Sequence, residues 1–384
     1  MGTALYAYPW NVHDADDFVG RVKALGSDDV TLAVSYHAGK FIHPGDPKAR
    51  VYFPEDGTVY FQPRRLYGAL QPQVSQLTQT RDVLAELCER DDIGVNAWTV
   101  LNHNTRLGML RPDLCVRNAF GDTYPYSLCP AQPEVRTYAK TLSADIASGY
   151  RVKSLLLETP GYLTYGHGYH HEFAQVPGNA WLDAMLGLCF CERCHTGANA
   201  AGIDVAGLAA RISSAVDTFL DGAGEGQSLD AWNAEDKDLA AFHRFRCDVV
   251  TSLVAEIRDA VDPAVPVKII STCQRPHATA YLEGHDLVAL DAVSDGLELP
   301  LYQPNAEAVL ADGRWVLDRV KPSRTSVILR PGHPDLTTQA DLDTALSGLR
   351  AMGITDFAFY NLGMLRPADL NRLRQALTKE NSYV

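Results

Sequence analysis

The chain has 384 residues, of which 46% are hydrophobic, and carries a formal net charge of −13 at pH 7. This length and apolar content suffice for a large buried core, in two modest domains or in one α/β barrel with insertions. The negative charge argues against nucleic acid and anionic membranes as partners, because both would repel an acidic surface.

Short apolar runs alternate along the chain with segments of helical periodicity, a pattern typical of repeated βα units with a parallel sheet. We predict strands at residues 4–10, 30–36, 94–101, 152–158, 265–272, 296–302, 325–330 and 356–361. We predict helices at residues 14–25, 73–90, 133–148, 239–261 and 339–352. Eight parallel strands with crossover helices close most naturally into a (β/α)₈ TIM barrel. We therefore expect one α/β barrel domain over residues 1–384, with inserted loops at its C-terminal face.

Polar and aromatic residues gather where the predicted strands end, and in a (β/α)₈ barrel these C-terminal ends form the active face. Such side chains are costly to bury without partners, so their concentration predicts a lined polar pocket. The residues that we expect to bind a substrate there are Trp10, His37, His103, Asn104, His167, His170, Tyr302, Arg330 and His333.

Glu158 ends the fourth predicted strand, directly after three leucines. Apolar packing below this carboxyl and a closed pocket above it would raise its pKa and make it a general acid. The simpler alternative is a carboxylate that only pairs with an arginine at the barrel rim.

Glycoside hydrolysis usually needs two carboxylates that flank the scissile bond. Glu298, on the sixth predicted strand, is the first candidate for the second catalytic carboxylate, ahead of Asp335 and Glu172 in loops. Glu298 could equally lie deep in the barrel as a structural hydrogen-bond acceptor.

Cys189, Cys191 and Cys194 place three thiols within six residues, a spacing typical of metal ligands. Cys129 is the preferred fourth ligand because it opens the next helical pattern, with Cys115 and His195 as alternatives. Four thiolates leave no open coordination position, which predicts a structural Zn²⁺ and a zinc-binding insertion around residues 159–235.

The remaining cysteines, and a histidine-rich run, have other interpretations. Free cysteines are often core residues, and we expect this of Cys88, Cys247 and Cys273. The run of residues 167–172, His-Gly-Tyr-His-His-Glu, could form a second metal site. Without a fixed helical spacing, substrate binding is the favoured interpretation of that run.

The two cysteine segments, residues 129–136 and 189–194, resemble those of the family 42 β-galactosidases, in a clan of (β/α)₈ glycoside hydrolases. In that family the acid/base Glu ends strand four between the two segments, where Glu158 stands. The resemblance covers the middle third of the chain and implies a zinc cluster near the active site and a homo-oligomer, a trimer or a dimer. The wider pattern, including Tyr36-His37-Ala38 and Leu157-Glu158-Thr159, resembles uncharacterised bacterial hydrolase-like barrels and brings no known substrate.

Two departures from the clan pattern bear on mechanism. Leu157 stands where the clan has an Asn before the strand-four Glu. Residues 327–333, around the end of strand seven, contain no carboxylate in place of the clan's nucleophile. The retaining mechanism of that clan therefore cannot simply be carried over.

Together these features favour a glycoside hydrolase that acts on a small glycoside or oligosaccharide. Arg330 would suit a sugar acid, because a guanidinium binds carboxylates bidentately. A sugar lyase or isomerase stays an alternative, since one carboxylate among His, Tyr and Arg residues can abstract protons. A catalytically inactive carbohydrate-binding barrel is the non-enzymatic alternative.

The N-terminal residues 1–5 lack the basic region and apolar run of a secretory signal, and no apolar stretch approaches the length that spans a bilayer. Eight cysteines in such a chain fit reduced thiols and a metal site better than disulfides. We therefore expect a cytoplasmic protein.

Overall fold

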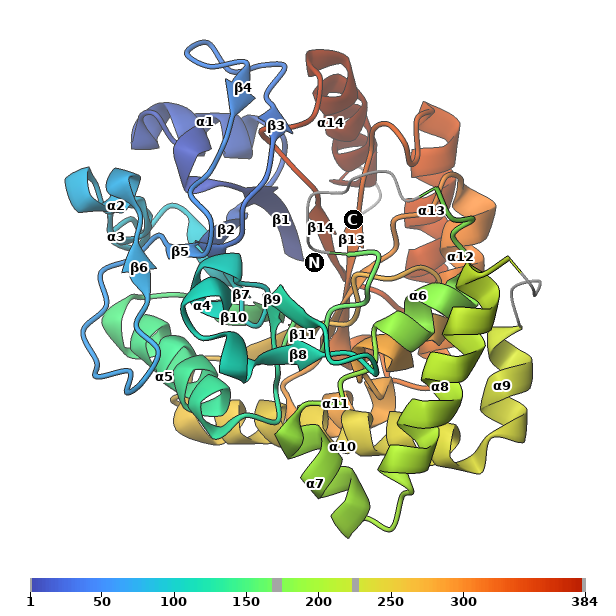
Figure 1. Cartoon of the computed structure of the whole chain (residues 1–384). Helices are drawn as coiled ribbons and strands as arrows, with labels where there is room; N and C mark the ends of the chain where they lie inside the picture. The colour runs from blue at the N-terminus through green and yellow to red at the C-terminus, as the bar shows by residue number, and fades with distance from the viewer. Residues whose placement is uncertain (1, 168–174, 223–227, 382–384) are drawn as a thin grey trace.

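The computed structural model describes residues 2–167, 175–222 and 228–381. In this part of the chain, eight parallel strands form a closed barrel surrounded by helices (Figure 1). The barrel closes because β1 pairs with both β2 and β14: Ala4 lies opposite Asp29 on one side and opposite Ala358 on the other. The predicted (β/α)₈ barrel is therefore confirmed. Its strands are β1 (Gly2–Ala7), β2 (Asp29–Tyr36), β7 (Gly94–Val100), β10 (Ser154–Glu158), β11 (Val267–Ile270), β12 (Leu297–Pro300), β13 (Thr325–Leu329) and β14 (Asp356–Phe359).

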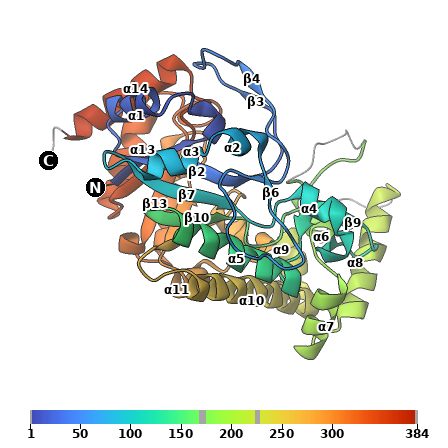
Figure 2. The same ribbon diagram turned by 90° about the vertical axis from the view of Figure 1, so that its left-hand side faces the viewer.

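Four of the predicted helices form close to their expected bounds. They are α1 (Ala15–Ala24), α5 (Pro133–Gly149), α10 (Lys237–Ala260) and α13 (Gln339–Ala351). Helices α5 and α10 lie side by side on the outside of the barrel (Figures 1 and 2). The outer layer also contains α11 (Leu287–Val293), α12 (Ala306–Leu317) and α14 (Pro367–Asn381). The 3₁₀ segments η1 (Pro9–Asn11) and η3 (His277–Glu283) follow β1 and β11, and η4 (Pro322–Arg324) precedes β13.

The prediction of one helix over residues 73–90 is wrong. The segment forms the short strand β6 (Gln73–Val74) and two helices, α2 (Gln76–Thr80) and α3 (Val83–Cys88). Arg81 between them is extended, and the Asp82 side chain accepts a hydrogen bond from the backbone N–H of Ala85. An aspartate that caps a new helix start competes with continuation of the preceding helix, which explains the break.

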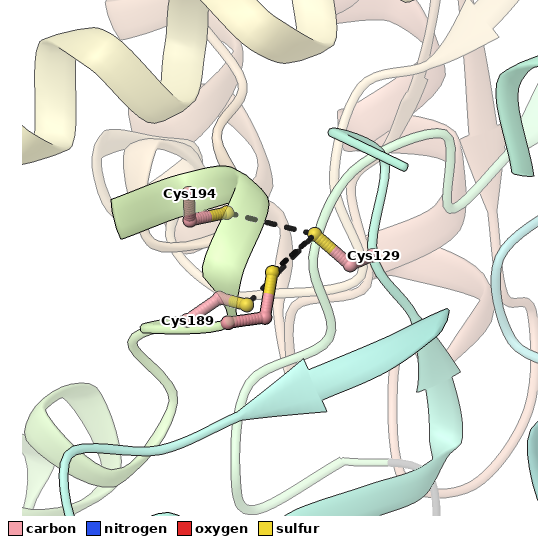
Figure 3. Close-up of side chains that lie close together, drawn as sticks. Cys129, Cys189 and Cys194 are labelled. Atoms are coloured by element: carbon pink, nitrogen blue, oxygen red, sulfur yellow. Dashed lines mark hydrogen bonds between the residues drawn. The ribbon is translucent and has the colours of Figure 1, made fainter. Parts of the chain in front are cut away.

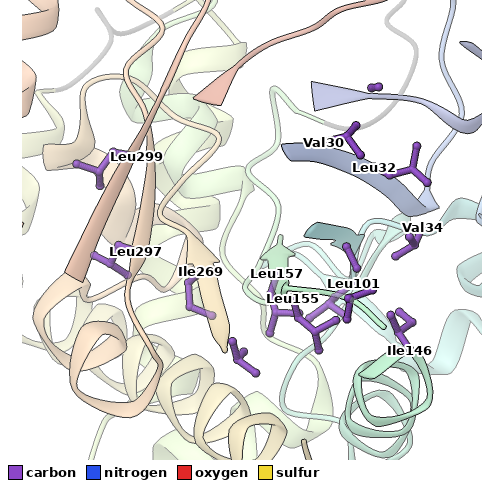
Figure 4. Close-up of a cluster of buried hydrophobic side chains, with 14 of the residues drawn as sticks. Val30, Leu32, Val34, Leu101, Ile146, Leu155, Leu157, Ile269, Leu297 and Leu299 are labelled. Atoms are coloured by element: carbon purple, nitrogen blue, oxygen red, sulfur yellow. The ribbon is translucent and has the colours of Figure 1, made fainter. Parts of the chain in front are cut away.

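Side chains along each barrel strand point alternately outward, toward the surrounding helices, and inward, into the barrel interior. In β10, Leu155 and Leu157 face the surrounding helices and belong to the main core, whereas Leu156 faces inward. Figure 4 shows the core side chains of β2, β10, β11 and β12, with Ile146 of α5. Glu158 follows Leu157 and therefore points into the barrel, as a period of two residues requires.

Aromatic side chains fill much of the barrel interior. Tyr6, Tyr8, Tyr36 and Trp98 pack together there with Ile270. Tyr6 and Trp98 meet edge to face, with ring centroids 5.1 Å apart. This aromatic layer closes the barrel beneath the C-terminal ends of its strands.

The insertions follow strands at the C-terminal face, as predicted. After β2 come β3 (Phe41–Ile42), β4 (Val51–Tyr52) and β5 (Thr58–Val59), and after β7 come α4 (Thr105–Leu110), η2 (Pro112–Leu114), β8 (Cys115–Arg117) and β9 (Thr123–Leu128). After β10 come α6 (Ala180–Leu186), α7 (Glu192–Ala200), α8 (Val205–Leu220) and α9 (Leu229–Glu235). This last group packs with the start of α10 around a separate apolar cluster that includes Trp181, Met185, Ile212 and Phe242.

None of the helices in the described ranges combines the length and the apolar composition that crossing a membrane requires.

Candidate active site

Glu158 is the last residue of β10, and its carboxyl group lies at the C-terminal end of the barrel interior. Trp98 Nε1 donates a 2.5 Å hydrogen bond to Glu158 Oε2, and Cys273 Sγ lies 3.6 Å from Glu158 Oε1. Burial raises the pKa of Glu158, and the hydrogen bonds from Trp98 and Cys273 partly oppose that rise. A carboxyl group of this kind keeps its proton to a higher pH than an exposed glutamate, which suits a general acid.

Glu158 opens into a pocket of about 370 Å³. Aromatic rings form much of its wall, and neutral and cationic side chains complete it. The aromatic lining residues are Tyr6, Tyr36, Trp98, Tyr302 and Tyr360, and the other polar ones are His37, His167, Thr272, Cys273, Arg275 and Arg330. Such a wall offers ring faces for stacking on sugars and donors for hydroxyl or anionic groups.

The loop after Glu158 is held in an uncommon backbone conformation. Thr159 has a φ of +51°, in the left-handed region that residues other than glycine rarely adopt. Asn102, just beyond β7, donates from its side-chain amide to the carbonyl oxygens of Pro160 and Gly161, at 2.6 and 3.2 Å. A β-carbon at Gly161 would lie 2.2 Å from the carbonyl oxygen of Glu283, so this position requires glycine. These contacts hold the strained turn at Thr159, directly after Glu158, in place.

Arg330 follows β13 and lines the pocket opposite this loop. Its Nε lies 2.8 Å from Asp335 Oδ2, at an angle that makes an ion pair rather than an aligned hydrogen bond. Its guanidinium carbon lies 4.3 Å from the centre of the Tyr302 ring. Arg275 Nη1 donates both to Asp335 Oδ1, at 3.1 Å, and to the Tyr302 carbonyl oxygen, at 2.5 Å. Asp335 and Tyr302 thus hold two arginines at one side of the pocket.

Three of the predicted histidines contact one another at the pocket rim. The rings of His37 and His103 lie 4.0 Å apart and nearly parallel, and His167 meets His103 edge to face at 5.6 Å. Tyr36 stacks on the other face of His37 at 4.3 Å. Burial lowers the pKa of His167, so this ring is neutral near pH 7. His170 lies outside the described residues.

The structure does not bring Trp10, Asn104 or His333 into the pocket. Trp10 is sandwiched between the rings of Tyr8 and Tyr52, and its Nε1 donates to His43. Asn104 caps α4, because its Oδ1 accepts a hydrogen bond from the backbone of Leu107 at 2.9 Å. His333 is exposed beyond the end of β13 and is not among the lining residues. These three have structural or peripheral positions.

Glu298 lies lower in the barrel than Glu158. It is the second residue of β12 and is only 5% exposed. It accepts hydrogen bonds from Tyr6 Oη at 2.6 Å and from Ser326 Oγ at 2.8 Å. It lines a separate cavity of about 250 Å³ at the N-terminal end of the barrel, next to Gly2 and Asp29. Its position matches the structural alternative that the sequence left open.

The expectation that Cys273 is an ordinary core thiol is wrong. It follows β11, lines the pocket and points its thiol at Glu158. Burial raises the pKa of this thiol, as do the neighbouring Glu158 and Glu283 carboxyls, so it stays protonated and can donate. Cys273 directly follows the predicted strand at residues 265–272, and a position at a strand end is the same signal that singled out the other candidates.

Glu283 is a buried carboxyl that the sequence analysis missed. It lies at the end of η3 and is 3% exposed. Its Oε1 accepts hydrogen bonds from Thr272 Oγ1 and from the backbone N–H of Cys273, both at 2.9 Å. Burial raises its pKa to about 7. A turn segment with helical composition, far from any predicted strand end, offered no sequence signal for this role.

The four predicted cysteines come together in the structure. Cys191 and Cys194 belong to the start of α7, Cys189 to the turn before it, and Cys129 to the segment after β9 (Figure 3). Cys129 Sγ lies 3.5, 3.8 and 3.6 Å from the sulfurs of Cys194, Cys189 and Cys191. All four sulfurs are buried and lie within 4.8 Å of one another. Cys115, an alternative ligand, donates instead to the Gly108 carbonyl oxygen.

This arrangement fits a tetrahedral metal. Four sulfurs at about 2.3 Å from a central zinc would lie about 3.8 Å apart, close to the distances from Cys129. Donors surround the cluster: Tyr162 Oη lies 3.4 Å from Cys194 Sγ, and Gln132 Nε2 lies 3.8 Å from Cys191 Sγ. The buried guanidinium of Arg246 lies 4.4 Å from the Tyr162 ring centre and would offset the charge of metal-bound thiolates.

No protein-family model and no curated protein sequence matches the chain, so the family 42 resemblance stays a prediction. Solved structures do match. The glycoside hydrolase domain of PgaB (BpsB) from Bordetella bronchiseptica aligns over 98% of this chain and 99% of its own, with 16% identity and a TM-score of 0.59. Alpha-L-fucosidase isoenzyme 2 from Paenibacillus thiaminolyticus aligns over 99% of this chain and 49% of its own, with 14% identity and a TM-score of 0.53. At these identities the likeness shows that the chain shares their barrel fold.

Proposed function

We propose that the protein is a glycoside hydrolase that acts on a small glycoside or oligosaccharide, with Glu158 as its proton donor. The observation that carries this proposal is the carboxyl of Glu158, which has a raised pKa and opens into an aromatic-lined pocket at the C-terminal face. The names of the two structural neighbours, a glycoside hydrolase domain and a fucosidase, support the same chemistry.

In the proposed reaction, protonated Glu158 gives its proton to the glycosidic oxygen while the bond from that oxygen to the anomeric carbon breaks. A water oxygen then bonds to the anomeric carbon. The proton that this water loses returns to the Glu158 carboxylate, so the sum is the addition of one water to one glycoside. Tyr6, Tyr36 and Trp98 would stack on or enclose the sugar ring.

Glu298 has a different proposed role. Because its carboxyl accepts the Tyr6 hydroxyl from below, it would position the Tyr6 ring in the pocket floor rather than touch substrate. It is therefore a positioning residue in this proposal.

The four cysteines would hold a structural Zn²⁺. Four thiolates leave no open position for substrate, so the ion would fasten α7 to the segment around Cys129. Tyr162 contacts Cys194 and donates its backbone N–H to the Glu283 carbonyl oxygen at 2.9 Å. The metal site would in this way steady the loop that follows Glu158.

A second candidate, a sugar lyase, is favoured by one observation. Glu158 is the one carboxylate among the described lining residues, beside several tyrosines and two arginines. In elimination, a base removes a proton from the sugar ring, the bond to the leaving oxygen breaks, and an unsaturated sugar results.

The test compares wild type with Glu158→Gln on nitrophenyl glycosides and on the matching methyl glycosides or oligosaccharides. Loss of a general acid costs about 10²- to 10⁴-fold in rate. The loss should be larger for methyl than for nitrophenyl glycosides, because nitrophenolate leaves without help. The matched variant Glu298→Gln should lose less activity and more stability.

Solvent labelled with ¹⁸O separates the chemistries, since hydrolysis places the label in the product and elimination gives ultraviolet absorbance without it. Unchanged turnover in Glu158→Gln would move the catalytic acid elsewhere. An unsaturated product would replace the hydrolase with the lyase.

A further inference from the structure

We infer that the sugar accepted by this pocket carries a carboxylate, which Arg330 and Arg275 bind. The inference rests on the proposed function in one respect, that the pocket at Glu158 binds a carbohydrate.

The first support is the state of Arg330. Its side chain is 23% exposed and lines the pocket, and the Tyr302 ring supports the flat face of its guanidinium. Its Nε faces Asp335. Within residues 2–167, 175–222 and 228–381, no hydrogen bond involves either of its terminal amino groups. A planar edge of two N–H donors is therefore left for a ligand.

The second support is the charge balance at this side of the pocket. Asp335 is 1% exposed and is the shared carboxylate partner of Arg330 and Arg275. Two guanidiniums against one carboxylate leave one positive charge. In its proton-donating form Glu158 is neutral, and Glu298 belongs to the cavity at the other end of the barrel. An anionic substituent on the sugar would complete this balance.

The third support is that both guanidinium groups are held in place before any ligand binds. Arg275 is fixed by the Tyr302 carbonyl oxygen and by Asp335, and Arg330 by Asp335 and the Tyr302 ring. Little side-chain entropy is left to lose on binding. The chain as a whole has a formal net charge of −13, so the positive charge of these two arginines is a local feature. A guanidinium edge binds a planar carboxylate through two parallel N–H···O hydrogen bonds.

The experiment measures binding by calorimetry in the Glu158→Gln protein, so that turnover does not interfere. The ligands are methyl glucuronide and methyl galacturonide, each against its neutral methyl hexoside, with glucose 6-sulfate as the other anion. We expect the better-fitting of the two uronides to bind about tenfold or more tightly than its neutral methyl hexoside. Adding Arg330→Gln or Arg275→Gln should reduce that preference to about twofold or less.

Arg319→Gln is the matched control, because Arg319 also lies over an aromatic ring, that of Trp315, but is exposed and follows the end of α12. It should keep the full preference. Arg275 is 41% exposed, so its variant keeps the test valid should Arg330→Gln fail to fold.

Equal affinity for acid and neutral sugars, or no binding by any of them, would overturn the inference, as would tighter binding of glucose 6-sulfate than of both uronides. A failure of the proposed hydrolysis looks different. If wild type prefers uronides but turns over no glycoside, the carboxylate inference stands and the proposed hydrolase activity is wrong. If wild type turns over neutral glycosides alone, the hydrolase activity stands and the carboxylate inference is wrong.

Discussion

Trp98 donates its indole N–H to Glu158 Oε2 at 2.5 Å, so one side chain both forms the pocket wall and influences the pKa of the proposed acid. The two residues lie on the neighbouring strands β7 and β10, where Trp98 pairs with Leu156. The hydrogen bond favours the charged form of Glu158 and counters the effect of burial.

Trp98→Phe should therefore raise the pKa of Glu158 further. A general acid works only while protonated, so activity is lost as pH rises through this pKa. The high-pH limb of kcat/KM should move to higher pH in the variant, even if kcat/KM itself falls. Trp315→Phe, at a half-buried tryptophan of α12 that does not line the pocket, is the control and should leave the limb in place. A shift of the limb to lower pH would contradict the assignment.

The buried Glu283 makes stability depend on pH. Its pKa rises from 4.5 to about 7 on folding, so the folded protein holds this proton more tightly than the unfolded chain. The free energy of unfolding should consequently fall by about 2–4 kcal/mol as pH rises from 4.5 to about 7. Glu283→Gln should remove most of that fall in urea unfolding measured at several pH values. Glu89→Gln, at an exposed glutamate after α3, should retain it, and an unchanged slope in Glu283→Gln would refute the prediction.

The cysteine cluster predicts about one zinc per chain in the purified protein, measured by mass spectrometry of the metal. Cys129→Ser should lose most of the metal and lower the Tm by roughly 5 °C or more. Cys115→Ser is the matched control, since Cys115 is equally buried but only donates to nearby carbonyl oxygens. Metal-free protein with an unchanged Tm would show that the cluster is a set of packed thiols, and iron in place of zinc would correct the metal.

Substitution of Asn104 distinguishes a helix-capping role of this residue from a substrate-binding role. Asn104→Ala should destabilise the protein by about 1 kcal/mol, because the Leu107 N–H loses its acceptor. The KM of an active substrate should stay within about twofold, and Asn104→Asp, which restores an acceptor, should recover the stability. A large rise in KM with unchanged stability would return Asn104 to the binding site.

The sequence by itself determined the barrel and the close approach of three of its cysteines. Apolar runs of strand length recur eight times, and their bounds differ from the observed strands by a few residues, because burial on both faces of a barrel strand leaves a local signal. The spacing of Cys189, Cys191 and Cys194 is also local, since one helix start brings these thiols together. The choice of Glu158 as the candidate acid followed from its position as the last residue of a predicted strand.

The tertiary structure decided which of the remaining candidates meet. Glu298 and Glu158 both point into the barrel, but the depth of each depends on its position along its strand, and the second residue of β12 lies far below the last of β10. Arg275 and Asp335 are 60 residues apart in sequence, and Cys273 reaches Glu158 across 115. Contacts over such separations depend on how whole strands and loops are placed around the barrel, and no short stretch of sequence carries that information.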